Sequence, residues 1–132
     1  MKKMRILSPK NSISVLGLSY KPNTDDIRES ISTKIVEKCL AHDITIKVHD
    51  PMAIENFKKE FGDQIEYHKS VNSCLQSTDC CIILTEWSEY KKLSSKSFSA
   101  MNKKNVIDTR RILHNKKLKN VNYHAIGLGI TE

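Results

Sequence analysis

Residues 12–49 read SISVLGLSYKPNTDDIRESISTKIVEKCLAHDITIKVH, and this stretch contains two apolar runs separated by a segment of helical periodicity. The runs at 12–18 and 44–49 are rich in β-branched residues, which is typical of strands. Apolar residues recur at helical spacing between them: Ile31, Ile35, Val36, Cys39 and Leu40. Ser30 stands where a helix N-cap is expected, so the stretch predicts a strand, a helix from Ser30 to His42 and a second strand.

The rest of the sequence continues this alternation of strands and helices. The apolar run Cys80–Thr85 predicts a strong central strand, and the run Asn105–Asp108 predicts another. Weaker strands are predicted at 65–68 and 121–126, the second of them at an edge of the sheet. Further helices are predicted over 53–60, 71–77, 95–101 and 112–117. This order is typical of right-handed crossovers, so we expect an α/β fold: a three-layer Rossmann-like sandwich with a mostly parallel sheet of five to six strands.

The length and composition are those of one soluble globular domain. A chain of 132 residues with 39% hydrophobic composition has material for one core. We expect that domain to span residues 12–132, after a polar N-terminal arm at 1–11. No apolar run approaches the roughly 20 residues of a membrane-spanning helix, and the residues after Met1 lack the apolar stretch of a secretory signal. The expected location is therefore the cytoplasm.

The cysteines and histidines do not form a metal-binding pattern. The four cysteines, Cys39, Cys74, Cys80 and Cys81, contain no Cys-x-x-Cys spacing, and the five histidines are scattered singly. In a cytoplasmic protein such cysteines are expected to be reduced thiols in the core. We therefore predict no protein metal site.

The chain is basic, with 22 Lys and Arg against 15 Asp and Glu and a formal net charge of +7. The basic residues form short clusters along the whole sequence, as expected of a solvated surface. RNA-binding modules interleave aromatic residues with basic ones on strands, and this sequence contains only three Phe, four Tyr and one Trp. The charge favours an anionic partner such as a phosphorylated small molecule, and a nucleic acid is a weaker candidate that rests on charge alone.

Ligands of such a sheet bind beside the carboxyl ends of the strands, next to the switch in strand order. Four segments follow the predicted strands there: residues 19–29, Asp50-Pro51, Glu86-Trp87 and 108–111. A dinucleotide-binding turn also needs Gly-x-Gly-x-x-Gly after the first strand, and Gly17 stands alone. We therefore do not expect this chain to bind NAD in the usual way by itself.

Four motifs in these segments closely resemble the C-terminal domain of the UDP-glucose/GDP-mannose dehydrogenase family. They are VLGLSYKPNTDDIRES at 15–30, Asp50-Pro51, Thr85-Glu-Trp87 and Asp108-Thr-Arg-Arg111. The resemblance covers about residues 12–130. The run Lys21–Glu29 is most similar to UDP-glucose 6-dehydrogenases, although dehydrogenases of UDP-N-acetyl amino sugars carry similar versions.

The resemblance implies a place in a larger enzyme. Family members have an NAD-binding Rossmann domain, a helical middle domain with the catalytic cysteine, and this C-terminal domain, which closes over the UDP-sugar. They oxidise the sugar C6 alcohol twice, with two NAD, through a cysteine thiohemiacetal and thioester, and the full enzyme is expected to be a homodimer. This sequence lacks the first two parts, and none of its cysteines lies in the Gly-rich segment that holds the family nucleophile. We therefore assign no catalytic residue and expect the isolated chain to be catalytically incompetent.

The resemblance also assigns roles to individual residues. Lys21 matches the family lysine that contacts the UDP-sugar, and Tyr20 matches an aromatic position beside the nucleotide sugar. Arg110 lies in an Asp-x-Arg motif whose arginine reaches the substrate, and a guanidinium suits sugar hydroxyls or phosphate oxygens. Arg28 matches an arginine that reaches the NAD pyrophosphate. We expect Tyr20, Lys21 and Arg110 to bind substrate and Arg28 to bind the cofactor.

Several of these residues also have simpler structural interpretations. Tyr20 could pack within its loop, and Arg28 could pair with Asp25 or Asp26. The adjacent carboxylates also suggest a magnesium site like that of phosphorylation-receiver domains, but in those domains the pair follows the first strand directly. Asp50-Pro51 is expected to shape the exit from the second strand, Trp87 to contribute packing rather than a ligand contact, and Arg111 to be a surface charge.

Three functions remain. The leading one is the UDP-sugar-binding domain of an NAD-dependent nucleotide-sugar 6-dehydrogenase, which converts UDP-glucose to UDP-glucuronate by two hydride transfers in the full enzyme. The alternative is a non-catalytic nucleotide-binding or oligomerisation module derived from that family. The third is a nucleic-acid-binding domain.

Overall fold

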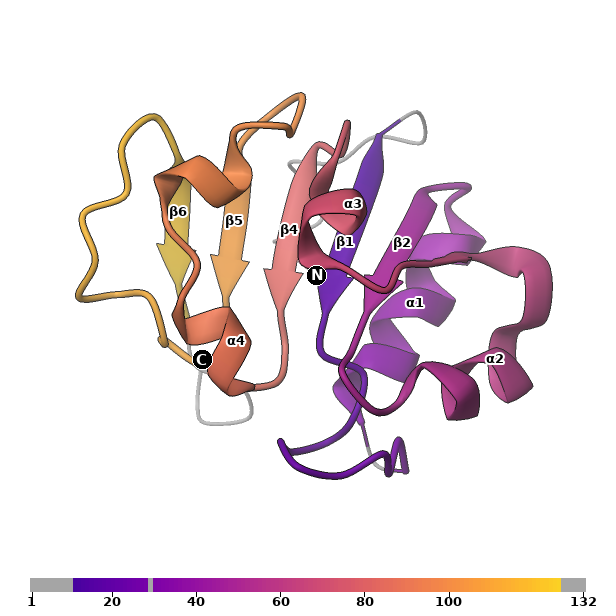
Figure 1. Ribbon diagram of the computed structural model, residues 1–132. Coiled ribbons are helices and arrows are strands. Elements are labelled where there is room, and N and C mark those ends of the chain that lie inside the picture. The colour runs from indigo at the N-terminus through magenta and orange to yellow at the C-terminus, as the bar shows by residue number, and fades with distance from the viewer. Residues whose placement is uncertain (1–10, 29, 127–132) are drawn as a thin grey trace.

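A single parallel sheet of six strands runs through residues 11–28 and 30–126, which the computed structural model describes (Figure 1). The strands are β1 Ser12–Leu16, β2 Thr45–His49, β3 Glu66–Tyr67, β4 Cys80–Ile83, β5 Asn105–Asp108 and β6 Asn122–Ala125. Their order across the sheet is β3-β2-β1-β4-β5-β6, so the direction of winding reverses between β1 and β4. The predicted α/β class and all the predicted strands are confirmed, with β6 at an edge.

Helices cover both faces of this sheet (Figure 1). The α-helices are α1 Ile31–Ala41, α2 Ile54–Phe61, α3 Val71–Leu75 and α4 Ser88–Lys91, and the 3₁₀ helices are η2 Gly62–Gln64 and η3 Ser95–Phe98. One core cluster joins α1 and α2 to one face of the sheet, and a second joins α3, α4 and η3 to the other. The expected three layers are therefore present. Within the described ranges, no helix is long and apolar enough to cross a membrane.

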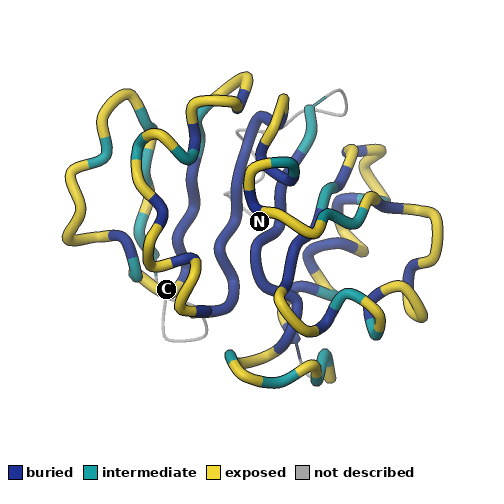
Figure 2. Tube along the Cα trace, in the orientation of Figure 1, coloured by how far each residue is buried: buried dark blue, intermediate teal, exposed yellow. Residues whose placement is uncertain are grey.

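The alternation of side chains along β4 explains why this strand is apolar at every position. Cys80 and Ile82 belong to the core cluster of α1 and α2, whereas Cys81 and Ile83 belong to the opposite cluster. All four side chains are buried, and Figure 2 shows the central strands buried along their length. A strand with helices on both faces has no solvated side, so a continuous apolar run replaces the alternation of a surface strand.

Helix α1 starts at the residue that the sequence predicted. Ser30 caps it, because its Oγ accepts the backbone N–H of Ser32 at 3.2 Å. The same Oγ donates to the carbonyl oxygen of Leu18 at 2.8 Å. The cap therefore also ties the start of α1 to the segment that follows β1.

Two helix predictions are wrong. In place of the helix expected over 95–101, Ser95–Phe98 form the 3₁₀ helix η3, and residues 112–117 form a turn and a bend. In the second segment the N–H of Lys116 donates to the carbonyl oxygen of Leu113 at 3.0 Å, a hydrogen bond of a single turn, and the N–H of Leu113 donates to Asp108 Oδ2 at 2.8 Å. No sequence signal predicted α4 or η2. The predicted N-terminal arm lies outside the described residues, except for Asn11.

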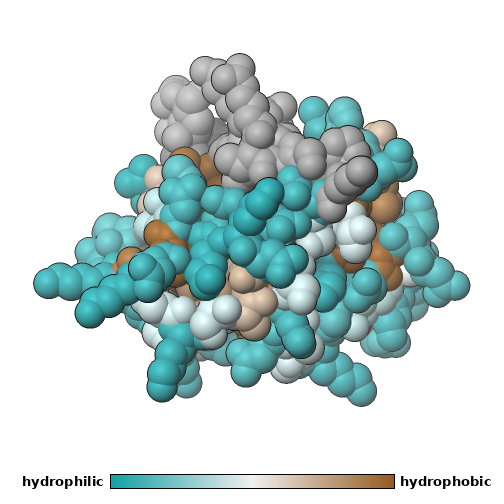
Figure 3. All heavy atoms as spheres, turned by 90° about the horizontal axis from the view of Figure 1, so that it is seen from above, coloured by the Kyte–Doolittle hydropathy of each residue, from teal (hydrophilic) through white to brown (hydrophobic). Residues whose placement is uncertain are grey.

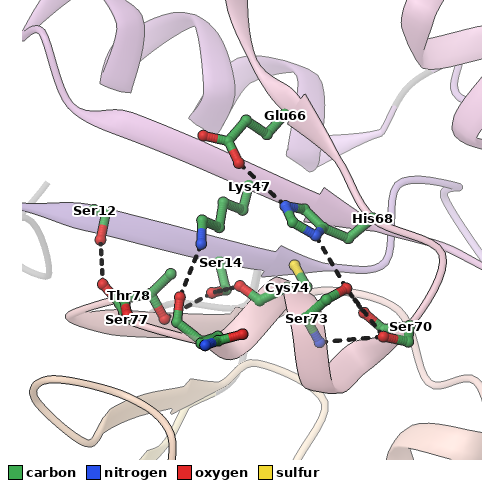
Figure 4. A network of polar contacts seen from close by, with 11 residues as sticks. Ser12, Ser14, Lys47, Glu66, His68, Ser70, Ser73, Cys74, Ser77 and Thr78 are labelled. Atoms are coloured by element: carbon green, nitrogen blue, oxygen red, sulfur yellow. Dashed lines mark hydrogen bonds and ion pairs between the residues drawn. The ribbon is translucent and has the colours of Figure 1, made fainter.

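Polar contacts join the short helix α3 to the sheet (Figure 4). Ser14 Oγ on β1 lies 2.7 Å from the carbonyl oxygen of Cys74 and 2.8 Å from Thr78 Oγ1. Lys47 Nζ on β2 donates to the carbonyl oxygen of Gln76 at 2.8 Å. These side chains provide partners for carbonyl groups at the end of α3, which a helix leaves without internal partners. They fix a helix of only 5 residues against the sheet.

Candidate functional site

The carboxyl ends of β1, β2, β4 and β5 meet at one edge of the sheet, the lower edge in Figure 1. The four segments expected there from the sequence begin at the ends of these strands or within three residues of them. The winding reverses between β1 and β4, so this edge is the place where Rossmann-like sheets bind ligands. Figure 3 views the opposite edge, where the visible described side chains are mostly hydrophilic.

Gly17 directly follows β1 and lies against the segment after β4. Its φ is +102°, a conformation that residues with a Cβ rarely adopt. A Cβ here would lie 2.4 Å from Thr85 Oγ1 and 2.6 Å from the backbone nitrogen of Thr85. Thr85 Oγ1 in turn donates to the carbonyl oxygen of Ser19 at 2.7 Å. The loop after β1 is therefore packed directly on the end of β4, and only glycine fits at the crossing.

Asp50 connects three of the segments at this edge. Its carboxylate is 3% exposed, and Oδ2 accepts the backbone N–H groups of Leu18 and Ser19 at 2.7 and 3.2 Å. The same oxygen accepts the indole N–H of Trp87 at 3.1 Å. Oδ1 accepts two backbone N–H groups just before α2, at 2.8 Å each. The expected role in shaping the exit from β2 is therefore only part of what Asp50 does.

Arg110 extends from the end of β5, across the end of β4, to the loop after β1. Its Nε donates to the carbonyl oxygen of Leu84 at 3.0 Å, and its Nη2 lies 3.5 Å from the carbonyl oxygen of Tyr20. Its own backbone N–H donates to Asp108 Oδ1 at 3.1 Å. The guanidinium therefore lies beside the loop that carries the other two predicted substrate residues.

Tyr20 and Lys21 are exposed on the loop after β1. Lys21 Nζ lies 5.4 Å from the centroid of the Tyr20 ring, a distance typical of a cation–π contact. The backbone N–H of Tyr20 donates to the carbonyl oxygen of Asp26 at 3.1 Å, and Ser19 Oγ donates to the carbonyl oxygen of Lys21 at 2.7 Å. The backbone of the loop is thus held in place, while the ring and the ammonium group face solvent.

Arg28 pairs with Asp26 rather than with Asp25. Its Nε and Nη2 donate to the two oxygens of Asp26 at 3.0 and 2.8 Å, and its backbone N–H donates to Oδ1 at 2.9 Å. These hydrogen bonds lower the pKa of Asp26 from 3.8 to about 2. The Arg28 side chain is 87% exposed. The structure therefore shows the pairing within the loop, and the contact of Arg28 with NAD stays a prediction.

Sequence reasoning missed a buried pair that consists of His49, which precedes Asp50 at the end of β2, and Tyr90 of α4. His49 Nδ1 lies 2.8 Å from the Tyr90 hydroxyl, which lies 3.1 Å from the carbonyl oxygen of His49. Burial lowers the pKa of His49, although its Nε2 lies 4.0 Å from a Glu89 oxygen. A pocket of about 490 Å³ opens beside the pair at the ends of β2 and β3. The sequence did not indicate the pair, because Tyr90 lies on α4. This short helix has Trp87 at its N-cap and no side-chain cap that would have predicted its start.

The cysteines lie in the two core clusters as free thiols, as the sequence predicted. Burial raises the pKa of Cys39 to about 11 and those of Cys74 and Cys80 to about 12. Burial also raises the pKa of Cys81. Buried, protonated thiols of this kind are typical of core side chains.

A known family accounts for the motifs at this edge. The model of the UDP-glucose/GDP-mannose dehydrogenase family, UDP binding domain, matches residues 14–115. The chain belongs to this family. The matched region contains the four predicted site residues: Tyr20, Lys21, Arg28 and Arg110.

Curated UDP-glucose 6-dehydrogenases are similar to most of the chain. The enzyme of Rickettsia prowazekii is 36% identical over 121 residues, which are 88% of this chain and 28% of that protein. An enzyme of Bacillus subtilis is 34% identical over 119 residues, which are 88% of this chain and 26% of that protein. The chain therefore spans little more than a quarter of the length of these relatives.

Solved dehydrogenases of the family share the fold. A UDP-glucose dehydrogenase from Pyrobaculum islandicum superimposes with a TM-score of 0.72 at 29% identity, over 96% of this chain and 27% of that chain. The UDP-N-acetyl-mannosamine dehydrogenase of Staphylococcus aureus gives a TM-score of 0.75 at 28% identity, over 96% of this chain and 28% of that chain. The chain is thus the family's UDP-binding domain in a Rossmann-like fold. The roles of its individual site residues remain predictions.

Proposed function

We propose that this domain binds the UDP-sugar of an NAD-dependent nucleotide-sugar 6-dehydrogenase at the carboxyl edge of β1, β4 and β5. The full enzyme oxidises UDP-glucose to UDP-glucuronate by two hydride transfers, with NAD as the hydride acceptor. The observation that carries the proposal is the convergence of Tyr20, Lys21 and Arg110 from distant parts of the family's UDP-binding domain. We place the enzyme in the cytoplasm, because a reducing compartment suits the buried free thiols.

The three side chains suit a nucleoside diphosphate sugar. The ammonium group of Lys21 offers a compact positive charge to a diphosphate oxygen. The guanidinium of Arg110 donates several N–H bonds in one plane, which suits phosphate oxygens or sugar hydroxyls, and its bond to Leu84 sets the orientation of that plane. The Tyr20 ring, 38% exposed, offers an apolar face to the ligand.

Arg28 is the proposed contact with NAD. Its exposed guanidinium already binds an anion, Asp26, through two parallel hydrogen bonds, and a pyrophosphate accepts the same geometry. In the assembled enzyme we expect Arg28 to exchange Asp26 for phosphate oxygens. The dinucleotide-binding turn and the catalytic cysteine come from parts of the enzyme beyond this domain, so this chain contributes to NAD binding only through Arg28.

A second candidate, an oligomerisation module derived from the family, is favoured by apolar side chains at the same edge. The large hydrophobic residues exposed in the described ranges are Tyr20, Ile31 and Met52. All three lie on segments that follow β1 and β2. Exposed apolar side chains are available for contacts with another protein. In the leading proposal these residues face the other domains of the enzyme or the second subunit of a homodimer.

An NMR titration of the isolated chain with UDP tests the leading proposal. Two charge-assisted contacts of about 1.5–3 kcal/mol each, less the cost of association, give an expected Kd in the millimolar range. We expect shifts at the amides of residues 19–21 and at Arg110 Nε, and weaker binding of UMP, which has one phosphate fewer. Shifts confined to other parts of the chain would refute the site. Dimerisation without any UDP-dependent shift would support the oligomerisation module instead.

A further inference from the structure

Asp50 is a buried carboxylate whose hydrogen bonds all go to segments around the candidate site. Its N–H donors are the backbone groups of Leu18, Ser19, Met52 and Ala53 and the indole of Trp87, and the Ser19 hydroxyl lies 3.4 Å from Oδ2. They come from the loop after β1, the start of α2 and the segment after β4. A carboxylate that accepts this many N–H groups is compensated in charge without a cation.

These hydrogen bonds fix the residue immediately before the proposed substrate loop. The N–H of Ser19 donates to Asp50, its carbonyl oxygen accepts from Thr85 Oγ1, and its Oγ donates to the carbonyl oxygen of Lys21. A residue held at all three of its polar groups has little freedom to rotate. The positions of Tyr20 and Lys21 therefore depend on the position of the Asp50 carboxylate.

We propose that Asp50 is a positioning residue for UDP-sugar binding, which acts through the N–H groups of Leu18 and Ser19 to place Tyr20 and Lys21. The proposal rests on the proposed function, because it requires UDP at this edge. Asp50 itself does not touch the ligand: it is 3% exposed, and its lone pairs are occupied by N–H donors. Asp50 contributes by holding the backbone of the loop in place, and a displacement of about 1 Å in the binding groups of a site weakens ligand binding.

Asp79 supplies a matched control at the opposite edge of the same strands. It is 7% exposed, and its Oδ2 accepts the backbone N–H of Ser12 at 2.9 Å and the Asn11 Nδ2 at 3.3 Å. Asp79 thus ties the amino ends of β1 and β4, as Asp50 ties their carboxyl ends. Loss of the Asp79 carboxylate should lower the stability of the fold but leave the positions of Tyr20 and Lys21 unchanged.

The experiment compares Asp50→Asn, Asp79→Asn and the wild-type chain in NMR titrations with UDP, at a temperature below all three melting temperatures. Asparagine keeps the size of the side chain but presents an NH₂ group to the N–H donors. Both variants should lower Tm. Only Asp50→Asn should lower the initial slope of shift against UDP concentration, by on the order of tenfold.

The outcomes separate this proposal from the proposed function. Wild-type binding with equal slopes for both variants would overturn the positioning role and leave UDP binding intact. A wild-type chain with no UDP-dependent shifts at this edge would overturn both. If Asp50→Asn does not fold, Trp87→Phe takes its place, because it removes one donor and keeps the carboxylate. A reduced slope with displaced Leu18 and Ser19 amide resonances would support the role, and a wild-type slope would overturn it.

Discussion

The carbonyl oxygen of Tyr20 lies 3.5 Å from Nη2 of Arg110, although 90 positions separate these residues in the sequence. The contact passes over the end of β4, where Arg110 Nε also donates to the carbonyl oxygen of Leu84. β1 and β5 flank β4 in the sheet, so Lys21 and Arg110 approach the edge from opposite sides of that strand. The motif after β1 and the motif after β5 form one candidate site because both strands are neighbours of β4, and Arg110 spans the end of that strand.

Replacing Lys21 or Arg110 by Ala should lower kcat/KM of the full enzyme for the UDP-sugar. Loss of one charge-assisted contact to a phosphate costs on the order of 2 kcal/mol, or roughly thirtyfold in kcat/KM for the UDP-sugar. Steady-state kinetics with UDP-glucose varied at saturating NAD measures the effect. Lys34→Ala removes an exposed lysine of α1 and should keep wild-type constants. Unchanged constants for both Lys21→Ala and Arg110→Ala would refute the site.

Arg28→Ala should mainly weaken the binding of NAD by the full enzyme. If Arg28 contacts the pyrophosphate, its loss should raise KM for NAD and change the kinetics with UDP-glucose little. Asp26→Asn provides the comparison, because it weakens the pairing in the loop but keeps the arginine. If Arg28 only braces the loop, both variants should weaken binding of both substrates together and lower Tm. Kinetics with each substrate varied separately distinguishes the two results.

The ionisation of Asp26 should depend on Arg28. Hydrogen bonds from Arg28 lower its pKa from 3.8 to about 2 in the folded chain. The pair therefore stabilises the fold above pH 3.8, and this small contribution disappears as the pH falls toward 2. NMR titration of the carboxyl carbon should show the pKa returning toward 3.8 in Arg28→Ala. A pKa that stays near 2 in that variant would assign the shift to another cause.

Gly17→Ala should destabilise the fold strongly. The added Cβ would meet the backbone nitrogen of Thr85 at 2.6 Å, in a residue with a φ of +102°. We expect a loss of about 2–4 kcal/mol in the free energy of unfolding, measured by urea denaturation. Gly62→Ala is the control, since its φ is +54° but nothing lies within 4 Å of a Cβ there, and it should cost about 1 kcal/mol. Equal costs would mean that the end of β4 moves aside.

The stability of the domain should fall as the pH drops below about 6.5, the ordinary pKa of histidine. Burial lowers the pKa of His49 in the folded chain, so the unfolded chain takes up a proton that folded His49 does not. The stabilising contribution is complete above the unfolded pKa and is lost as the pH falls toward the folded one. Urea unfolding across this range should show a flatter pH dependence for His49→Gln. His42→Gln, at an exposed histidine, should keep the wild-type slope.

Local signals explain which elements were predictable. Helix α1 carries its own cap at Ser30 and a clear apolar stripe, so its start follows from the sequence. The predicted helix over 112–117 is instead a turn, in which the N–H of Lys116 donates to the carbonyl oxygen of Leu113. The Asp108 carboxylate also accepts the N–H of Leu113 at 2.8 Å, and a contact of this kind between a strand end and a turn is visible only once the chain is folded.

The candidate site also contains residues that the sequence indicates and residues whose role depends on the fold. Tyr20, Lys21 and Arg110 lie in motifs that follow strands, so the sequence indicates them. Asp50 also follows a strand, but the importance of its carboxylate depends on N–H groups that lie 32 positions before it and 37 positions after it. Hydrogen bonds over such separations have no periodicity in the sequence, so the role of Asp50 required the fold.

The central position of β1 limits when this chain can fold during synthesis. One neighbour, β2, follows within the same β-α-β unit, but the other begins at Cys80, which pairs with Ile13. Until Cys80–Ile83 has left the ribosome, one side of β1 has no partner, and its backbone is open to pairing with other chains. Parallel pairing over such distances is also slow to form. A chain that stops before β4 therefore leaves one side of β1 without its native partner, and we expect it not to form half of the domain.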